Sequence, residues 1–562
     1  MKIQKKWLGL GLALSFGILA VGCSNNNNSK STSSESTDSS QKKLAAKQEL
    51  NLTEIAELPT GDTALATDTV SFTVFNQVLE GLYRLDKESQ PIPALAKEEV
   101  KVSEDGLTYN FKLREGAKWS NGDNVTAKDF VYAWQRVVNP ATGSQYAYLF
   151  DGIENADAII KGEKTFDTLG VKAISDYEFE VKMEKPVPYF VSLMAFPTFF
   201  PQNEKFVTEK KEKYGTSAEN MIFNGPFVFK GWTGTNLSWQ YEKNPNYWDN
   251  KNVYLDKINV DVIKETATAL NLYDADKLDR VLLTGEYAKQ YQDDPAYKVV
   301  TEARSAYMQY NQVRDGKKTI FANENMRKAV AYSYDQKLLA NEILANGSKV
   351  LTGFVPADLA KNPTSGEDFR KESGSYLQYD KKKAQDYWEA AKKELGGDKF
   401  SIDLTADDDE TNKKISAFLK DQIEGTLPGL TVNVRSLPFK VRLEAGKTQN
   451  YDLMQGGWGA DFADPVNFID LLQTDSPYNR SSYSNAEFDK LLADSKGVNA
   501  VKPEARWKNL LDAEKILLDQ AGVSPLYQRA AAELQKPYVK DIYAHQVGAK
   551  FTYKNAYIEE QN

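Results

Sequence analysis

Residues 400–455 alternate between strand and helix patterns, and this alternation constrains the fold more strongly than any other feature of the chain. The segments follow one another in the order strand 400–404, helix 410–424, strand 430–434, helix 438–446 and strand 451–454. Such alternation predicts a parallel sheet with right-handed crossovers. Because ligands of such sheets lie beyond the carboxyl ends of the strands, the chain that leaves the last strand is the first candidate for a binding site.

That segment reads Gln455-Gly-Gly-Trp-Gly-Ala-Asp-Phe462. Its three glycines would let a ligand backbone approach closely, the Trp458 indole offers a flat apolar wall, and the Asp461 carboxylate can receive a cation. A tight turn, with Trp458 packed in the core and Asp461 in solvent, explains the same residues. The residues alone leave both interpretations open.

The rest of the chain indicates mixed α and β structure in which hairpins form antiparallel sheet. Thr126 and Asp129 predict a capping box at the start of an apolar helix face. The other clear patterns are strands at 108–113, 177–183, 227–232 and 237–241, and helices from about 325 to 347 and from 380 to 396.

Composition excludes several classes of chemistry. The 562 residues contain one Cys, Cys23, and one His, His545, so an intrachain disulfide, a CxxC pair, a His-rich metal site and a Ser/His/Asp triad are not expected. A net charge of -9 without a long basic run argues against nucleic-acid binding. The acidic run 407–410 lacks the spacing of a calcium loop and fits a helix N-terminus better. No cofactor is expected.

The N-terminus predicts export. Three lysines within the first six residues precede an uncharged stretch at 7–21, which at fifteen residues is shorter than the ~20 that span a bilayer. Residues 1–22 therefore fit a secretory signal peptide. Its end resembles a bacterial lipobox, which implies lipidation of Cys23 and a protein anchored to the cell membrane on its extracytoplasmic face. The segment 23–45 would be a disordered tether, since Ser, Thr, Asn and charged residues cannot bury a core.

Longer motifs make a family resemblance specific. The run 105–130, DGLTYNFKLREGAKWSNGDNVTAKDF, resembles the signature of family 5 extracellular solute-binding proteins, the dipeptide, oligopeptide and nickel group. The segments 224–227 (NGPF), 244–248 (NPNYW) and 326–335 (MRKAVAYSYD) occur in family order, and the match runs from about residue 50 to the C-terminus. The segment 457–462 is similar to the oligopeptide-binding branch, whose Asp takes the α-ammonium group of the peptide.

This resemblance implies an α/β fold of the type II periplasmic-binding-protein class, a two-lobed clamshell with an additional smaller domain. The expected divisions are the signal peptide 1–22, the lipidated Cys23 and tether 23–45, a discontinuous lobe I (46–79, 206–310 and 528–562), a hairpin-rich additional domain (80–205) and lobe II (311–527).

The resemblance also implies the binding residues. Residues 67–70 would pair with the peptide main chain as an added strand, and Asn479 and Arg480 lie where the family contacts the ligand backbone. The candidate peptide-binding residues are Thr67, Thr69, Tyr146, Phe439, Leu443, Gln455, Gly457, Trp458, Gly459, Asp461, Phe462, Asn479, Arg480 and Tyr527.

Two positions depart from the resembled proteins. An Arg that can hold the carboxylate of a short peptide is replaced by Gln455, and Gly446 stands where the family can carry a second Arg. A neutral amide cannot make a bidentate, charge-assisted bond. Weak binding of di- and tripeptides, and better binding of longer peptides, is therefore expected.

The implied function is capture of oligopeptides and delivery to the permease subunits of an ABC importer, by a monomer that is not an enzyme. Two alternatives stay open. The protein could be a receptor for one signalling peptide of the pheromone type, which would show affinity confined to one sequence. It could also be a secreted hydrolase that depends on carboxylates, for which the only support is abundant Asp, Glu, Trp and Tyr.

Overall fold

The computed structural model describes residues 42–561. The predicted signal peptide, the lipidation site Cys23 and most of the tether lie outside the described residues. Within residues 42–561, no helix combines the length and the apolar character needed to cross a membrane.

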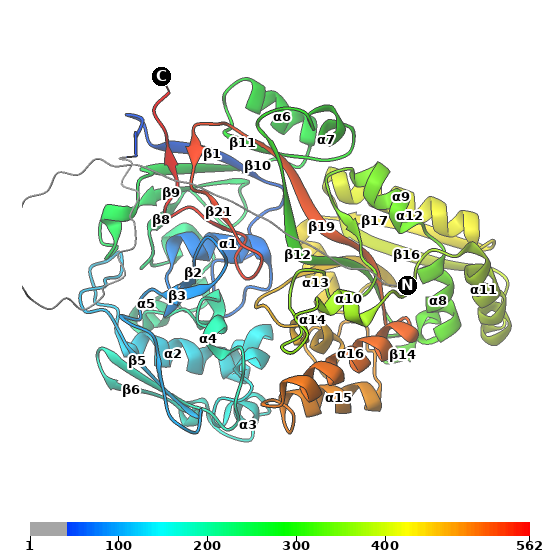
Figure 1. Cartoon of the computed structure of the whole chain (residues 1–562), viewed down its shortest axis with the longest axis horizontal. Helices are drawn as coiled ribbons and strands as arrows, with labels where there is room; N and C mark the ends of the chain where they lie inside the picture. The colour runs from blue at the N-terminus through cyan, green and yellow to red at the C-terminus, as the bar shows by residue number, and fades with distance from the viewer. Residues whose placement is uncertain (1–41, 562) are drawn as a thin grey trace, which may run out of the picture. The chain divides into compact units, whose positions relative to one another are not determined.

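The largest sheet has seven strands and mixed directions (Figure 1). Its order is β11-β19-β12-β18-β16-β17, and β15 also pairs with β19. The strand β16 runs parallel to both β17 and β18, which confirms the parallel sheet predicted from residues 400–455. The strands are β11 Arg280–Leu283, β12 Tyr297–Tyr310, β15 Lys349–Val350, β16 Phe400–Asp407, β17 Leu430–Leu437, β18 Leu453–Gly459 and β19 Val523–Gln535.

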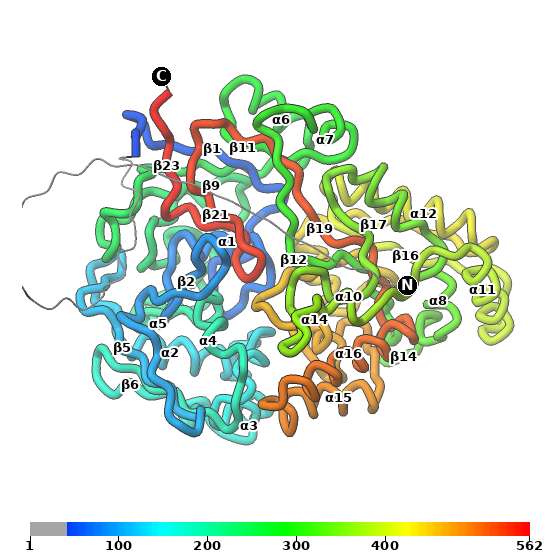
Figure 2. The backbone as a smooth tube through the Cα atoms, viewed as in Figure 1, coloured from blue at the N-terminus to red at the C-terminus, as the bar shows by residue number. Residues whose placement is uncertain are grey.

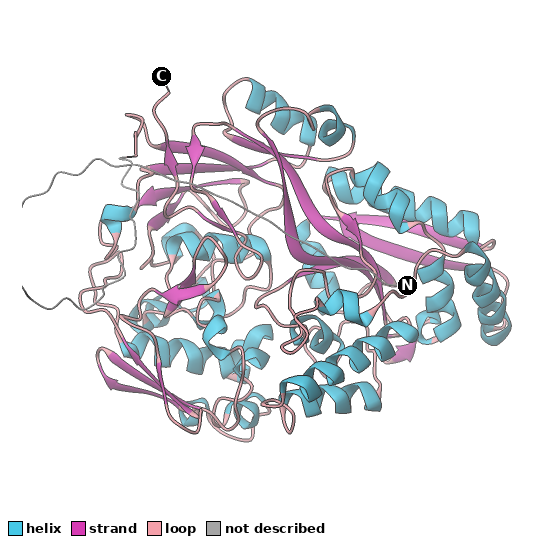
Figure 3. Ribbon diagram, viewed as in Figure 1, coloured by secondary structure: helices cyan, strands magenta, loops and turns pink. Residues whose placement is uncertain are grey.

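Two four-stranded sheets account for half of the remaining strands in the described residues (Figure 3). One has the order β1-β10-β9-β8 and contains the predicted 227–241 hairpin. The other, β4-β5-β7-β6, contains both alternating segments at 108–113 and 177–183. The strands are β1 Glu49–Glu54, β8 Phe227–Lys230, β9 Ser238–Lys243, β10 Lys257–Val262, β4 Lys101–Val102, β5 Thr108–Lys112, β6 Val171–Ser175 and β7 Glu178–Lys182.

The remaining strands of the described residues form short two-stranded pairs. The last residues of the chain return beside the first described ones, where the Ala45 amide donates to the Ile558 carbonyl at 2.9 Å (Figure 2). The pairs are β2 Tyr83–Leu85 with β3 Pro91–Pro93, β13 Val313–Arg314 with β14 Lys317–Lys318, β20 Val539–Lys540 with β23 Tyr557–Ile558, and β21 Tyr543–Ala544 with β22 Phe551–Thr552.

The helices pack their buried faces against these sheets. They are α1 Thr69–Val78, α2 Ala127–Val138, α3 Ala156–Ile160, α4 Phe190–Leu193, α5 Glu204–Lys210, α6 Thr266–Asp274, α7 Glu286–Gln290, α8 Glu324–Tyr332, α9 Gln336–Leu338, α10 Phe369–Ser373, α11 Lys381–Leu395, α12 Glu410–Thr426, α13 Phe439–Lys447, α14 Val466–Ile469, α15 Ala486–Lys496 and α16 Pro503–Asp519. Apolar side chains of α8, α11 and α12 form one core with β12, β16 and β18.

Helix ends follow the sequence signals in two cases and not in a third. The capping box of α2 is present, and α11 is capped by Asp380 at its start and by Gly396, whose φ is 72°, at its end. The single helix expected over 325–347 is wrong. The α8 helix ends at Tyr332, because the Asp335 carboxylate accepts from two following amides and so starts α9 instead of extending the first helix.

The two longest strands, β12 and β19, are antiparallel neighbours for most of their length, and we call them the crossing strands. Their register shifts where three residues of β12, 302–304, face Arg529 of β19. Such a bulge bends and twists a strand. The Glu302 carboxylate at the bulge lies 3.6 Å from Arg529 Nε and 2.9 Å from Lys550 Nζ, so the irregular point is also an ionic centre.

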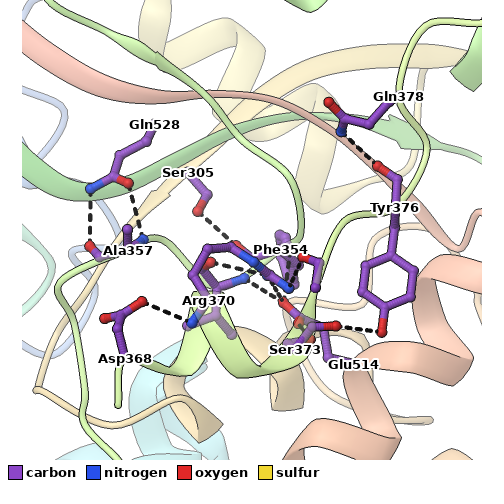
Figure 4. A network of polar contacts seen from close by, with 12 residues as sticks. Ser305, Phe354, Ala357, Asp368, Arg370, Ser373, Tyr376, Gln378, Glu514 and Gln528 are labelled. Atoms are coloured by element: carbon purple, nitrogen blue, oxygen red, sulfur yellow. Dashed lines mark hydrogen bonds and ion pairs between the residues drawn. The ribbon is translucent and has the colours of Figure 1, made fainter. Parts of the chain in front are cut away.

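A loop at 351–368 packs against the crossing strands beyond the bulge (Figure 4). The Ser305 hydroxyl donates to the Phe354 carbonyl at 2.7 Å. The Gln528 amide accepts from the Ala357 N–H at 3.0 Å and donates to the Ala357 carbonyl at 3.1 Å. Both crossing strands therefore hold the same loop.

The loop is held from its other side by Glu514 of α16, which is fully buried (Figure 4). Its carboxylate accepts from the amides of Phe354 and Val355 at 2.8 Å each and from Arg370 Nη1 at 2.7 Å. The Ser373 hydroxyl donates to the second oxygen. Four donors compensate for the removal of this charge from water.

We therefore expect the replacement of Glu514 to lower the stability of the protein far more than the replacement of an exposed carboxylate in the same helix. Glu514→Ala strands the Arg370 guanidinium and two amides, and we expect the free energy of unfolding to fall by roughly 3–5 kcal/mol in denaturant titrations. Asp512→Ala, which breaks an exposed pair with Lys508 in the same helix, should lower it by less than about 1 kcal/mol. Equal losses for the two variants would contradict this account.

Candidate functional site

A cleft with three adjoining compartments opens beside the crossing strands. The first compartment holds about 740 Å³ of empty space and is lined by Thr67, Asp68, Thr69, Phe72, Tyr146, Arg304, Tyr307, Gln309, Phe439, Arg442, Leu443, Gly456, Gly457, Trp458, Gly459, Asp461, Tyr478, Arg480 and Gly548. The second compartment shares Thr69, Arg304, Phe439, Arg442 and Gly457 with the first, and the third shares Tyr527 and Arg529 with the second. The three compartments form one continuous space.

Asp461 lies in the first compartment, two residues beyond the end of β18, and it is buried. The Tyr146 hydroxyl donates to Oδ1 at 3.2 Å, and Asn467 Nδ2 donates to Oδ2 at 3.2 Å. The Asn467 side chain is itself oriented by the Asp461 amide, which donates to its oxygen at 2.8 Å. The carboxylate is therefore held in one orientation by neutral donors.

The charge of Asp461 is not compensated by a nearby cation. Within residues 42–561, no Lys or Arg nitrogen lies within 4.0 Å of its carboxylate. Burial raises the pKa of Asp461 to about 7, and the hydrogen bonds from Asn467 and Tyr146 offset part of that rise. A ligand cation beside the Asp461 carboxylate would supply the missing opposite charge and stabilise the ionised form.

Aromatic rings form the wall beside Asp461. The Tyr146 and Trp458 rings are stacked with centroids 6.2 Å apart, and Tyr478 meets the edge of Trp458 at 4.7 Å. The Trp458 indole nitrogen donates to Asn467 at 3.3 Å, so the residue that orients the carboxylate also fixes the indole. The wall joins Tyr146, from the first third of the chain, to residues more than 300 positions later.

Three arginines line the first compartment: Arg304, Arg442 and Arg480. Arg442 makes a bidentate pair with Asp407, with Nε at 2.9 Å and Nη2 at 3.2 Å from the two oxygens. Arg304, which belongs to the bulge of β12, donates to the Thr69 hydroxyl. The compartment therefore has an anionic end at Asp461 and a cationic wall.

The structure brings most of the candidate residues together. Ten of the fourteen line the first compartment: Thr67, Thr69, Tyr146, Phe439, Leu443, Gly457, Trp458, Gly459, Asp461 and Arg480. Gln455 and Tyr527 line the second compartment, where the Gln455 side chain bonds to Asn412. The roles of these residues in binding stay predictions.

Two candidates do not line the cleft compartments. The Asn479 amide donates to three carbonyls of its own loop, the nearest being Tyr483 at 2.7 Å, and its oxygen accepts from the Tyr483 amide at 3.1 Å. It is therefore fully occupied in shaping the loop. Phe462 stacks on Tyr189 with centroids 4.2 Å apart, behind the carboxylate of Asp461. Both residues support the site from outside.

The added strand expected at 67–70 needs correction. Only Thr67 and Asp68 are extended or irregular, since Thr69 and Val70 form the first turn of α1. The Asp68 carboxylate accepts from the Ser71 amide and hydroxyl at 2.8 Å each, and this cap begins the helix. Helical residues cannot pair with a peptide as a strand, so any such pairing is limited to Thr67 and Asp68.

The glycine run is strand and not turn. Residues 456–459 continue β18 and pair with β12, where Gly457 faces Ala306 and Gly459 faces Arg304. A Cβ added at Gly457 would meet only the Ser305 carbonyl within 4 Å, so a side chain there would enter the open space of the cleft. The turn interpretation, with Asp461 in solvent, is wrong.

Sequence reasoning missed several lining residues, among them Arg304, Tyr307, Arg442 and Tyr478. Tyr478 could have been proposed from the sequence, because it directly precedes the candidates Asn479 and Arg480. The others carry no local signal, since each lies in an ordinary strand or helix pattern. Among residues 42–561 no cluster of three metal-ligating side chains occurs, and His545 is buried with Nε2 2.7 Å from the Thr552 hydroxyl.

Removing the charge of Asp461 should stabilise the protein without a ligand. The pKa is about 7 in the fold and about 3.9 in an unfolded chain, so stability is lost as pH rises through this interval. We expect Asp461→Asn to raise the free energy of unfolding at pH 8 by an amount on the order of a few kcal/mol, since Tyr146 and Asn467 can still bond to the amide. The gain should shrink toward pH 4, and a pH-independent difference would contradict the assignment.

Comparison with known proteins places this site in a family. Residues 90–480 match the model of the bacterial extracellular solute-binding proteins, family 5 middle region. The structure is similar to that of Listeria monocytogenes OppA bound to peptide, with a TM-score of 0.90 and 47% identity, and to the substrate-binding domain of an oligopeptide ABC transporter from Bacillus anthracis, with a TM-score of 0.90 and 44% identity. It is also similar to the pheromone receptor PrgZ, with a TM-score of 0.87 and 40% identity.

Each of these alignments covers 92% of this chain and all of the other chain. Agreement over that length confirms the expected α/β fold with two lobes and an additional domain. The motifs between 105 and 130 and between 457 and 462 anticipated the family match. The chain belongs to family 5 of the bacterial extracellular solute-binding proteins.

Proposed function

We propose that this protein captures oligopeptides in the cleft and delivers them to an ABC importer. The observation that carries the proposal is the buried Asp461 carboxylate, which has neutral donors on two sides and no cation. The α-ammonium group of a peptide supplies the missing charge and up to three donors. The similar Listeria protein is described as bound to peptide, and the similar Bacillus protein as part of an oligopeptide transporter.

Anchoring the ammonium group makes binding independent of the first side chain. The backbone that follows would meet the extended residues Thr67 and Asp68 on one side and the glycines of β18 on the other. Main-chain bonds of this kind give affinity without reading the sequence. The second and third compartments then have room for side chains and for bridging water.

The same proposal includes closure of two lobes about the crossing strands. Lobe I (46–79, 206–310 and 528–562) holds the β1-β10-β9-β8 sheet, lobe II (311–527) holds β16, β17 and β18, and the additional domain (80–205) supplies Tyr146. Closure would remove water from Asp461 and present one shape to the importer. Peptide exchange would require the lobes to separate.

Asp461 can be tested directly. Asp461→Ala should weaken the binding of peptides with a free amine by a few kcal/mol, on the order of 2 to 5, because the ammonium group loses its partner in a site without water. The same peptides with an acetylated N-terminus should be affected much less. Calorimetry on both sets measures the difference, and incubation with the wild-type protein shows whether the peptides leave intact. Equal losses of affinity for both sets would show that the peptide N-terminus is not anchored at Asp461. Cleavage of the peptides would favour the hydrolase alternative.

We also propose that the protein is held at the extracytoplasmic face of the membrane by lipid on Cys23. The family is extracellular, and the sole Cys of the chain follows the predicted signal peptide. Diacylated anchors meet the requirement of two membrane-binding signals. An acidic protein of net charge -9 gains no help from anionic lipid headgroups.

Cys23→Ala should therefore release the protein to the medium or leave it unprocessed. Fractionation followed by a wash at high salt distinguishes a lipid anchor from ionic association. The wild-type protein should stay with the membrane under the same wash. A mutant that fractionates and matures like the wild-type protein would refute the anchor.

A second candidate function within the same fold is reception of a signalling peptide. The similarity to the pheromone receptor PrgZ is the observation that favours it. Breadth of affinity separates the two functions, since an importer for nutrients should bind many unrelated peptides and a receptor only one. The mixed charges and open volume of the second compartment favour the broader role.

A further inference from the structure

Beyond the ammonium site, the first compartment contains a cationic wall in which Arg442 is paired with Asp407 but Arg304 and Arg480 have no acidic partner among the described residues. Within residues 42–561, no carboxylate lies within 4.0 Å of Arg304 or Arg480, although ion pairs are common elsewhere in the described chain. The carboxylate of Glu302, adjacent in the bulge, is already bound to Arg529 and Lys550. Asp68, which also lines the compartment, is committed as the cap of α1. Two guanidinium groups therefore face the cavity without an acidic partner.

Arg480 is the less satisfied of the two. Its Nε is buried and has no hydrogen-bond acceptor, and its guanidinium lies 5.5 Å from the ring centroid of Tyr478. A buried N–H without an acceptor is unfavourable, because it has lost its hydrogen bond to water without gaining another. The position therefore has unused capacity for an acceptor that enters with a ligand.

The place of Arg480 explains a departure seen in the sequence. A Cβ at Gly446 would come within 3.0 Å of Arg480 Nη1 and 3.3 Å of its Cδ. The glycine at 446 therefore leaves room for the Arg480 side chain beside α13, where a larger residue would crowd it. Arg442, one turn before Gly446 in the same helix, lines the same compartment. Where the resembled proteins can carry an Arg at 446, this chain places two other arginines.

The three guanidinium groups lie close to one another. Burial lowers the pKa of Arg480, and the charge of Arg442 lowers it further. Arg442 acts on Arg304 in the same direction. The Tyr307 phenol lies within range of all three charges, and together with the amide of Gln309 it offers neutral polar groups on the same wall. Cations held this close repel each other, and an anion between them would relieve the repulsion.

We propose that Arg480 and Arg304, supported by Arg442, form a carboxylate-binding subsite in the first compartment. The inference rests on the proposed peptide binding and names a preference within it: a peptide whose ammonium group meets Asp461 and which carries a carboxylate within its first few residues. The limit to the first few residues follows because Asp461 and the three arginines line one compartment. The carboxylate can come from an Asp or Glu side chain, or from the C-terminus of a short peptide.

The two sources are distinguished by two peptide sets with free amines. The first set is a heptapeptide series with Glu or Gln at position 1, 2 or 3, and the second is a tripeptide with a free or an amidated C-terminus. We expect at least one comparison to show about tenfold or greater preference for the carboxylate, since a charge-assisted bidentate bond is lost in its amide partner. Preference in the first set assigns the subsite to side chains, and preference in the second assigns it to the C-terminus.

Variants connect the preference to the residues. Arg480→Gln should reduce the preference to less than about threefold, and Arg304→Gln should reduce it in part. Arg480→Lys should keep only part of it, because an ammonium group cannot form the bidentate bond. Arg435→Gln is the matched control: this Arg lies on β17, 4.0 Å from Asp403, and lines no compartment of the cleft. It should leave the preference unchanged.

Several outcomes would overturn the subsite. Equal affinities for Glu and Gln at all three positions, together with equal affinities for the free and amidated tripeptide, would show that the wall does not bind carboxylates. A preference that survives both Arg480→Gln and Arg304→Gln would place the anion elsewhere. If Arg480→Gln does not fold, the Arg304→Gln and wild-type titrations decide. Failure of the wild-type protein to bind any of these peptides would instead refute peptide binding itself.

Discussion

The pairing of β12 with β19 is the interaction on which the rest of the structure depends. These two strands are the longest in the described chain and join strand β11 on one side to the parallel strands on the other. Several parts of the site are attached to them: Arg304 and Tyr307 come from β12, Tyr527 and Arg529 from β19, and Trp458 from the strand that pairs with β12. A strand pair that is continuous between two bodies of structure permits bending at a bulge while the register on either side is kept.

The bulge concentrates charge where the strands are least regular. Glu302 binds two cations there and Arg304 enters the cleft beside it, so a change in strand bend would move a charged side chain relative to the ligand. The loop at 351–368 is held by both strands and by Glu514, whose carboxylate is the centre of a buried polar network (Figure 4). A buried carboxylate that accepts from several donors in this way favours one arrangement over near alternatives.

Within residues 42–561, two buried charges in the first compartment lack partners of opposite sign, which is unfavourable for the stability of the protein. Asp461 is buried without a cation, and Arg480 is buried without an anion, although a direct pair between them would have satisfied both. Keeping them apart leaves two places where a ligand restores favourable electrostatics. The aromatic wall of Tyr146, Trp458 and Tyr478 limits access of water to the carboxylate, which strengthens its interaction with any ammonium group that enters.

The sequence by itself determined the local elements and much of the site. Hydrophobic periodicity predicted the parallel unit at 400–455, and capping residues predicted the helix start at Thr126 and the helix end at Gly396. These signals depend on neighbours only a few residues apart. The motif resemblance placed Asp461 and Trp458 among the candidate binding residues. Only the tertiary structure decided that Asp461 is buried, that residues 69 and 70 are helical, and that Arg304, Arg442 and Arg480 share one wall. Burial and charge proximity arise between residues that are more than 300 positions apart, as in the bond between Tyr146 and Asp461, and no local pattern records such distances.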